Sequence, residues 1–214
     1  MTETVILWGL FFFMIAHFVV PIIQLSDNYF IKESNILEKL TYFVRLALAC
    51  TATWIIMFIA VFHGYCQTIA ELFQLSDRAF YLDWWNSRNL SQYWRTWNLP
   101  IHSFFLRHVS NPLTSFGLNR HAINTIVFVI SAIFHEYIIS LSIKTFCTWT
   151  LVSFSLQYFY ILFESFYMKY FKLEKSNYGN YMFWGMFCVY GQPTLVLQYY
   201  FYVKYRQNFS LWPF

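Results

Sequence analysis

Apolar residues form long runs separated by shorter polar stretches. The runs cover approximately residues 5–24, 43–65, 121–143, 146–167 and 181–203. Each approaches or exceeds the roughly 17 to 25 residues that a membrane-spanning helix needs. The first run follows Met-Thr-Glu-Thr instead of a basic stretch and has no small-residue cleavage site after it, so we interpret it as a transmembrane helix. The pattern predicts an all-α polytopic membrane protein with about five transmembrane helices.

The composition also favours a membrane protein. Of 214 residues, 58% are hydrophobic and 11% are charged, whereas a soluble domain carries about 25% charged residues. This excludes an ordinary soluble globule. The sequence has no internal repeat or flexible linker, so residues 1–214 are expected to form a single membrane domain. The net charge of +4 is modest, and no cluster of Lys and Arg indicates a nucleic-acid partner.

The cysteines and histidines do not follow the spacing of a metal site. The 4 cysteines lack paired spacing and a CxxC motif, so we interpret them as packing residues. None of the 6 histidines takes part in an HxxxH or HExxH pattern. The sequence therefore predicts neither a disulfide framework nor a bound metal.

Residues 66–120 are not expected to span the membrane. This segment mixes tryptophans with arginines, for example Trp84, Trp85, Arg88 and Arg95, and both residue types suit the membrane–water interface. We expect interfacial amphipathic helices here, and a small excess of Lys and Arg on this side of the membrane predicts that the segment is cytosolic. The first interpretation, from composition alone, is that these helices only anchor the protein at the membrane surface.

The polar side chains of this segment favour a second interpretation, the docking of a polar ligand. They are Asp83, Asn86, Asn89, Asn98 and His102. Burying such groups without partners costs roughly 2 to 7 kcal/mol each, which makes a polar partner the better explanation. Asn98 also stands just before Leu99-Pro100, where a helix is disfavoured, so we expect a helix break that lets Asn98 point into a cavity.

His135 and Glu136 lie side by side near the centre of the run 121–143. An ionisable group at that depth costs roughly 2.5 to 3.5 kcal/mol or more, and such groups face a bundle interior or a wet cavity. Adjacent residues of a helix point about 100° apart, so if His135 faces a chamber, Glu136 faces a neighbouring helix as a hydrogen-bonding partner. The alternative is that His135 only makes a structural hydrogen bond between helices.

Two glutamines place further polar groups within the apolar runs. Gln192 lies between Gly191 and Pro193, which should unwind or kink the last run, and irregular helices at membrane depth are tolerated where they line a cavity. Gln157 lies within the run 146–167. A plain kink is the alternative explanation for the glycine and the proline.

Together, these uncharged polar groups suit acyl transfer between lipids. A neutral histidine can take the proton of a hydroxyl as the hydroxyl oxygen attacks an acyl carbonyl. Amide side chains such as that of Asn98 can donate hydrogen bonds to the developing oxyanion. A proton-coupled transporter more often has several acidic residues within its spans, and here we expect Glu136 alone at that depth.

Several motifs resemble those of a known family. FYLDWWN at 80–86 and HEY at 135–137 are similar to the two signature motifs of the acyl-CoA branch of the membrane-bound O-acyltransferase family. Four further motifs resemble the diacylglycerol acyltransferase type-1 members more than the sterol acyltransferases: WNLPIH at 97–102, LRH at 106–108, NYGN at 177–180 and GQP at 191–193. The resemblance extends over essentially the whole chain.

The resemblance implies a multi-pass enzyme of the endoplasmic reticulum that esterifies diacylglycerol with fatty acyl-CoA, giving triacylglycerol and free CoA. It implies that His135 is the catalytic base, that Asn98 lies near the thioester and that Glu136 supports the histidine. The substrate-binding residues that it implies are Gln157, Gln192, Trp97, Tyr81, Asp83, Trp84, Trp85, Asn86 and His102. Those of the FYLDWWN motif would shape the cytosolic acyl-CoA entrance. No metal or organic cofactor is implied, because acyl-CoA is a substrate.

Members of this branch are considerably longer. We therefore expect the chain to correspond to the C-terminal part of the family fold, without the N-terminal helices and the region that contributes to self-association. Two alternatives stay open. The chain could be a related enzyme that acylates a sterol or a long-chain alcohol, or a non-catalytic membrane fragment that associates with a full-length relative.

Overall fold

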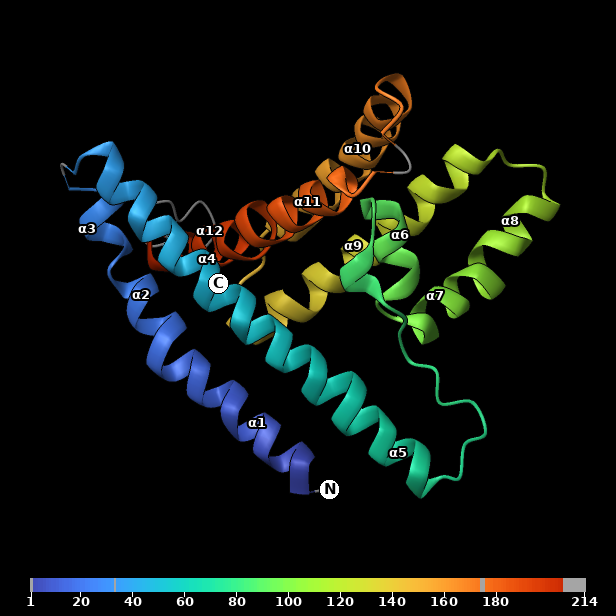
Figure 1. Cartoon of the computed structure of the whole chain (residues 1–214), viewed down its shortest axis with the longest axis horizontal. Helices are drawn as coiled ribbons and strands as arrows, with labels where there is room; N and C mark the ends of the chain where they lie inside the picture. The colour runs from blue at the N-terminus through green and yellow to red at the C-terminus, as the bar shows by residue number, and fades with distance from the viewer. Residues whose placement is uncertain (1, 33, 174–175, 206–214) are drawn as a thin grey trace. The chain divides into compact units, whose positions relative to one another are not determined.

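The computed structural model describes residues 2–32, 34–173 and 176–205, and every regular element in these ranges is helical (Figure 1). This confirms the all-α class. The α-helices are α1 (Thr2–Met14), α2 (Val20–Gln24), α3 (Ser26–Phe30), α4 (Ile36–Phe58), α5 (Cys66–Leu72), α6 (Leu90–Thr96), α7 (Leu99–Phe105), α8 (Asn111–Ser115), α9 (Arg120–Ile143), α10 (Trp149–Tyr170), α11 (Tyr178–Gly185) and α12 (Gln192–Tyr205).

Short irregular turns of helix join several of these elements. The π-helical turns are η1 (Ile15–Val19), η2 (Ile59–Tyr65), η4 (Leu106–Ser110) and η5 (Met186–Gly191), and η3 (Trp84–Asn86) is a 3₁₀ turn. The η5 turn ends at Gly191, directly before Gln192 and the buried Pro193. The sequence predicted unwinding or a kink at this point. A π-helical turn directly precedes this point and the chain continues into α12, so the helix is irregular here without ending.

Among the residues that the structure describes, three helical stretches are long and apolar enough to cross a membrane. They are Thr2–Phe30, Ile36–Leu72 and Arg120–Ile143, and they contain the first three expected spans. The other two expected spans are helical as well, in α10 and in the stretch from α11 to α12. Their serine, tyrosine and glutamine residues lower the mean hydropathy, and they are not among the candidate spans of the described residues. Their crossing of the membrane stays a prediction.

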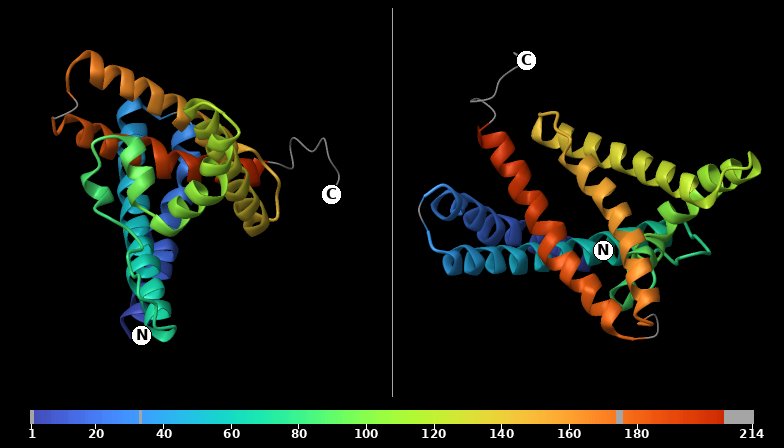
Figure 2. Two further views of the ribbon diagram at one scale, coloured as in Figure 1. Left: turned by 90° about the vertical axis from the view of Figure 1, so that its right-hand side faces the viewer. Right: turned by 90° about the horizontal axis from the view of Figure 1, so that it is seen from above.

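The chain divides into two compact units. Unit 1 comprises Met1–Phe80 and Trp184–Phe201, and unit 2 comprises Tyr81–Phe183 and Tyr202–Phe214. In unit 1, the α1 and α4 helices run side by side in opposite directions (Figures 1 and 2). The core of unit 1 consists of Val19, Ile23, Tyr42, Leu46, Ala49, Cys50 and Leu197.

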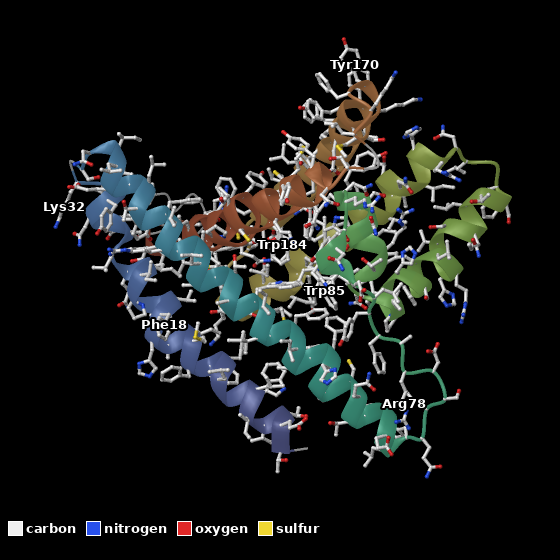
Figure 3. All side chains as sticks on the ribbon, viewed as in Figure 1. Phe18, Lys32, Arg78, Trp85, Tyr170 and Trp184 are labelled. Carbon is white, nitrogen blue, oxygen red and sulfur yellow. The ribbon has the colours of Figure 1, made fainter. Side chains whose placement is uncertain are left out.

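Polar residues fix the start of the long helix of unit 1. The Asn35 side chain accepts a hydrogen bond from the Glu38 backbone N–H at 2.8 Å, and the Glu38 carboxylate accepts one from the Asn35 backbone N–H at 3.3 Å. This reciprocal capping box satisfies two N–H groups that a helix end leaves without partners. It fixes the start of α4 a few residues after Lys32, which is labelled in Figure 3.

Unit 2 is built on the helical hairpin of α9 and α10, whose contacts are the most extensive between any two elements. The Asn119 side chain caps α9 by accepting a hydrogen bond from the Ala122 N–H at 2.9 Å. At the other end of α9, Lys144 adopts a left-handed conformation with φ of 51°, which ends the helix and turns the chain toward α10. The hairpin, α6, α7 and α11 carry the candidate site described next.

Candidate functional site

His135 is partly buried on α9 and held in one orientation by its own helix. Its Nδ1 lies 2.7 Å from the Ser131 carbonyl oxygen. A carbonyl oxygen only accepts, so Nδ1 carries the proton of this bond, and in a neutral imidazole the unprotonated nitrogen is then Nε2. The His135 ring also contacts the Phe154 ring of α10, with 4.6 Å between centroids. The imidazole is thus positioned with Nε2 as its basic atom.

Glu136 is buried and faces α10, as expected from its position next to His135. Its Oε2 accepts hydrogen bonds from the backbone N–H groups of Thr150 at 2.9 Å and Leu151 at 3.3 Å, both in the first turn of α10. Its Oε1 accepts one from Ser140 Oγ at 3.1 Å and one from Cys147 Sγ at 3.5 Å. A carboxylate at a helix N-terminus satisfies N–H groups and complements the helix dipole. Glu136 therefore joins α9 to α10 and supports the contact of Phe154 with His135.

Asn98 stands at a break between two helices, as its position before Leu99-Pro100 predicted. Here α6 ends at Thr96 and α7 begins at Leu99, with Pro100 in the first turn. The Asn98 side-chain oxygen accepts a hydrogen bond from the Ile101 N–H at 3.2 Å and caps α7. This bond engages Oδ1, so Nδ2 is the end of the amide that is suited to donate to a ligand.

An aromatic cluster connects α6 to the hairpin that carries His135. The Trp94 ring contacts Phe128 of α9 at 5.9 Å and Phe154 of α10 at 5.5 Å between centroids. Trp97 stacks on Tyr93 at 5.8 Å and packs edge-to-face on Trp94 at 6.0 Å. Phe154 thus contacts both the His135 ring and the ring of Trp94, which lies in the helix before Asn98. These contacts bring α6 and the histidine into one part of unit 2.

The residues of the FYLDWWN motif differ in their exposure. Trp84 is buried and packs against Tyr93 at 5.9 Å, whereas Asp83, Trp85 and Asn86 are exposed and Tyr81 is partly exposed. Trp85 is labelled in Figure 3. The family resemblance implied that these residues shape an entrance for acyl-CoA. The buried Trp84 anchors the segment within unit 2, and its neighbours are the ones that a ligand can reach from outside.

The other predicted substrate-binding residues lie at different places. Gln157 is partly buried on α10, three residues after Phe154 and thus on the same side of that helix. His102 is partly buried on α7. Burial lowers the pKa of His102, and the positive charge of Arg95 lowers it further, so both favour the neutral ring. Gln192 is the first residue of α12 and belongs to unit 1, and its place in a chamber with His135 stays a prediction.

Comparison with known proteins decides the family. The family model of the membrane-bound O-acyltransferases matches residues 4–200 of this chain. The chain belongs to the membrane-bound O-acyltransferase family. This membership agrees with the all-α architecture and with the three helices long and apolar enough to cross a membrane.

Individual members of the membrane-bound O-acyltransferase family are similar over almost the whole chain. Diacylglycerol O-acyltransferase 1C of Glycine max is 33% identical over 200 residues, which are 94% of this chain and 38% of the relative. Diacylglycerol O-acyltransferase 1 of Bos taurus is 35% identical over 188 residues, which are 87% of this chain and 36% of the relative. The chain spans less than half the length of these relatives.

Two polar residues near the FYLDWWN motif were missed as part of the site. Glu164, near the end of an expected span, is 1% exposed, and its Oε2 accepts a hydrogen bond from the Leu90 N–H at 2.8 Å. Glu136 was expected to be the only acid near the centre of a span, and Glu164 is a second buried acid, near the end of its helix. Asn180 donates hydrogen bonds to the carbonyl of Trp85 in the motif and to the carbonyl of Ser87 directly after it. Glu164 could have been found in the sequence as a second acidic residue within an apolar run. The contacts of Asn180 could not, because they depend on the tertiary structure.

Proposed function

We propose that the chain forms the catalytic part of an acyl-CoA:diacylglycerol O-acyltransferase of the endoplasmic reticulum membrane. The observation that carries the proposal is the orientation of His135, whose Nδ1–H is engaged by the Ser131 carbonyl so that Nε2 can accept a proton. Family membership supports acyl transfer, and the names of the similar relatives support diacylglycerol as the acceptor. Fatty acyl-CoA is then the acyl donor and a substrate, and the proposed reaction needs no metal or organic cofactor.

In the proposed reaction, the free hydroxyl oxygen of diacylglycerol attacks the carbonyl carbon of the thioester. His135 Nε2 takes the hydroxyl proton as the C–O bond forms, which prevents the build-up of positive charge on the attacking oxygen. The tetrahedral intermediate then expels the CoA sulfur, breaking the C–S bond. The imidazolium returns its proton to the thiolate, so that triacylglycerol and CoA–SH are formed and the histidine is neutral again.

The surrounding residues have supporting roles in this proposal. Asn98 Nδ2 donates a hydrogen bond to the oxyanion of the intermediate, while its Oδ1 keeps the cap of α7. Glu136 holds α10 against α9 and thereby keeps the His135 ring in place. Gln157, on the same side of α10 as Phe154, lines the substrate chamber. Trp97, His102 and the exposed residues of the FYLDWWN motif contact acyl-CoA.

The substrate assignment is tested by the products that the chain forms. The chain should be expressed in a yeast strain that lacks neutral-lipid synthesis, and its microsomes supplied with labelled acyl-CoA and either diacylglycerol, a sterol or a long-chain alcohol. We expect labelled triacylglycerol. Sterol esters or wax esters without triacylglycerol would contradict the assignment of diacylglycerol as the acyl acceptor. If product appears only when a full-length relative is co-expressed, the chain is an associating fragment instead of an enzyme by itself.

The role of Asn98 can be tested with a variant that keeps its structural function. Asn98→Asp retains an oxygen for the Ile101 N–H, and aspartate and asparagine are about equally good helix N-caps. The variant lacks the amide donor, so we expect triacylglycerol synthesis to fall by about 10²-fold or more, as for the loss of an oxyanion donor. The melting temperature of the purified protein should stay unchanged.

Asn98→Ala is the matched comparison for this experiment. It removes both the cap and the donor, so stability should fall by about 1 kcal/mol in addition to the loss of activity. Wild-type turnover in Asn98→Asp would show that the side chain serves only to cap α7.

A further inference from the structure

The stretch from Trp84 to Leu90, which contains the end of the FYLDWWN motif, is held by side chains from two later helices of unit 2. These side chains are Glu164 of α10 and Asn180 of α11. Both form hydrogen bonds with backbone groups of the stretch. They therefore hold its backbone conformation independently of the side chains that the stretch carries. We call this stretch, residues 84–90, the tryptophan loop.

Asn180 fixes the first half of the tryptophan loop. Its Nδ2 donates one hydrogen bond to the Trp85 carbonyl and one to the Ser87 carbonyl, each at 2.9 Å. The two protons of a single amide group therefore join two carbonyls that are two residues apart. These carbonyls lie in and just after the η3 turn, where regular helical hydrogen bonding does not continue. The amide of Asn180 supplies the partners that the turn itself lacks.

Gly179 makes this approach possible. A Cβ atom built on Gly179 would lie 2.0 Å from the Arg88 carbonyl oxygen and 3.0 Å from its carbonyl carbon. Both atoms belong to the backbone, so no flexible side chain can move to relieve the clash. Any residue other than glycine would push α11 away from the tryptophan loop and break the Asn180 hydrogen bonds.

Glu164 fixes the end of the tryptophan loop. Its Oε2 accepts the Leu90 N–H at 2.8 Å, and its Oε1 is buried without a hydrogen-bond partner among the described residues. Burying a carboxyl group with one oxygen unsatisfied is costly. Such a residue lowers the stability of the protein relative to an apolar one. Its presence is therefore better explained by the hydrogen bond that it makes than by a gain in stability. The bond that it makes sets the point at which α6 begins.

Packing supports the same arrangement. Phe183 is fully buried on α11, three residues after Asn180, and its ring contacts Trp84 at 6.5 Å and Tyr93 at 5.2 Å between centroids. One side of α11 thus holds the tryptophan loop through both hydrogen bonds and aromatic contacts. From the loop, the chain continues through α6 to the break at Asn98, so the position of the loop also sets where the proposed oxyanion donor stands.

We propose that Glu164 and Asn180 are positioning residues for acyl-CoA binding, which hold the tryptophan loop, and thereby its exposed residues Trp85 and Asn86 and the adjacent Asp83, in the conformation that receives acyl-CoA. The inference rests on the proposed function, because it takes the FYLDWWN motif as the acyl-CoA entrance. Neither residue touches the reacting atoms. Each contributes by making the loop rigid before the substrate arrives, which reduces the conformational entropy lost on binding.

Hydrogen–deuterium exchange of the purified full chain tests the structural half of this proposal. Asn180→Ala and Glu164→Leu should each increase the exchange rate of peptides covering 84–92 by roughly tenfold, as expected for the loss of about one to two hydrogen bonds. Peptides from α9 should exchange as in the wild type, which shows that the variant is folded. Tyr181→Phe, at an exposed tyrosine of α11 next to Asn180, is the matched control and should change nothing.

Kinetics test the functional half. Asn180→Ala and Glu164→Leu should raise the KM for acyl-CoA by roughly tenfold and leave the KM for diacylglycerol unchanged. Glu164→Gln keeps an oxygen for the Leu90 N–H and should restore the wild-type KM. An equal change in both KM values, or a change in kcat alone, would show that the contacts do not serve acyl-CoA binding.

The two assays separate this inference from the proposed function. If the wild-type chain forms no triacylglycerol, the proposed function fails for the chain by itself, and the exchange of peptides 84–92 still shows whether Glu164 and Asn180 hold the loop. If wild-type activity is present but exchange is unaltered in both variants, the positioning role is overturned and the proposed function stands.

Discussion

Replacing His135 with alanine should abolish triacylglycerol synthesis and leave the protein folded. General-base catalysis contributes typically 10² to 10⁴-fold to the rate, and Nε2 of His135 is the group proposed to supply it. The loss of stability should be small, because the imidazole is only partly buried and its hydrogen bond goes to a carbonyl of its own helix. Microsomal activity at matched expression, together with the melting temperature in detergent, measures both effects.

His121→Ala is the matched control for this variant. His121 lies on the same helix, α9, one residue after its start, and its side chain is exposed. We expect wild-type activity from this variant. Full activity in His135→Ala, or an equal loss in both variants, would contradict the role of His135 as the base.

The sequence predicts the positions of the long helices well because their physical causes are local. The run 121–143 was expected to form one helix, and α9 covers Arg120–Ile143. The apolar run supplies its length, and Asn119 supplies a capping side chain at its start. The break at Asn98 was predicted for the same reason, since Pro100 acts on the backbone next to it.

Contacts between distant segments could not be predicted from local pattern. Tryptophans at an interface look alike in the sequence, yet Trp84 is buried beneath Phe183 while Trp85 is exposed. The difference arises because α11 packs on one side of the tryptophan loop. In the same way, Gly179 appeared only as part of a motif, and the Arg88 carbonyl that requires a glycine lies far away in the chain. Conversely, the adjacent positions of His135 and Glu136 were sufficient to predict that they face different directions.

Mean hydropathy indicates a membrane span less clearly for the runs 146–167 and 181–203 than for the first three runs. Both are helical near the expected residues, as α10 covers Trp149–Tyr170. Their polar side chains serve contacts within the protein: Glu164 binds the Leu90 N–H, and the hydroxyl group of Tyr158 donates to the His121 carbonyl at 3.2 Å. A helix that uses polar residues in this way has a lower mean hydropathy than one that only faces lipid.

Removal of the Glu136 carboxylate should have the largest effect on stability. In Glu136→Ala, the buried N–H group of Thr150 and the partly buried N–H group of Leu151 lose their acceptor, and each unsatisfied group costs about 1 to 3 kcal/mol. We therefore expect a loss of roughly 2 to 5 kcal/mol in the free energy of unfolding, visible as a lower melting temperature of the protein in detergent. A melting temperature equal to that of the wild type would show that Glu136 does not hold the hairpin together.

Glu136→Gln separates a structural role of this residue from a chemical one. The glutamine retains one oxygen that can accept from the first turn of α10, but its NH₂ group cannot accept from the donors on the other side, Ser140 and Cys147. If Glu136 acts only by holding α10, activity should fall in proportion to the loss of stability in the Ala and Gln variants, because Phe154 then no longer fixes the His135 ring. If the Gln variant is as stable as the wild type and still inactive, the charge of the carboxylate contributes to the chemistry, and Glu136 belongs with His135 in the catalytic group.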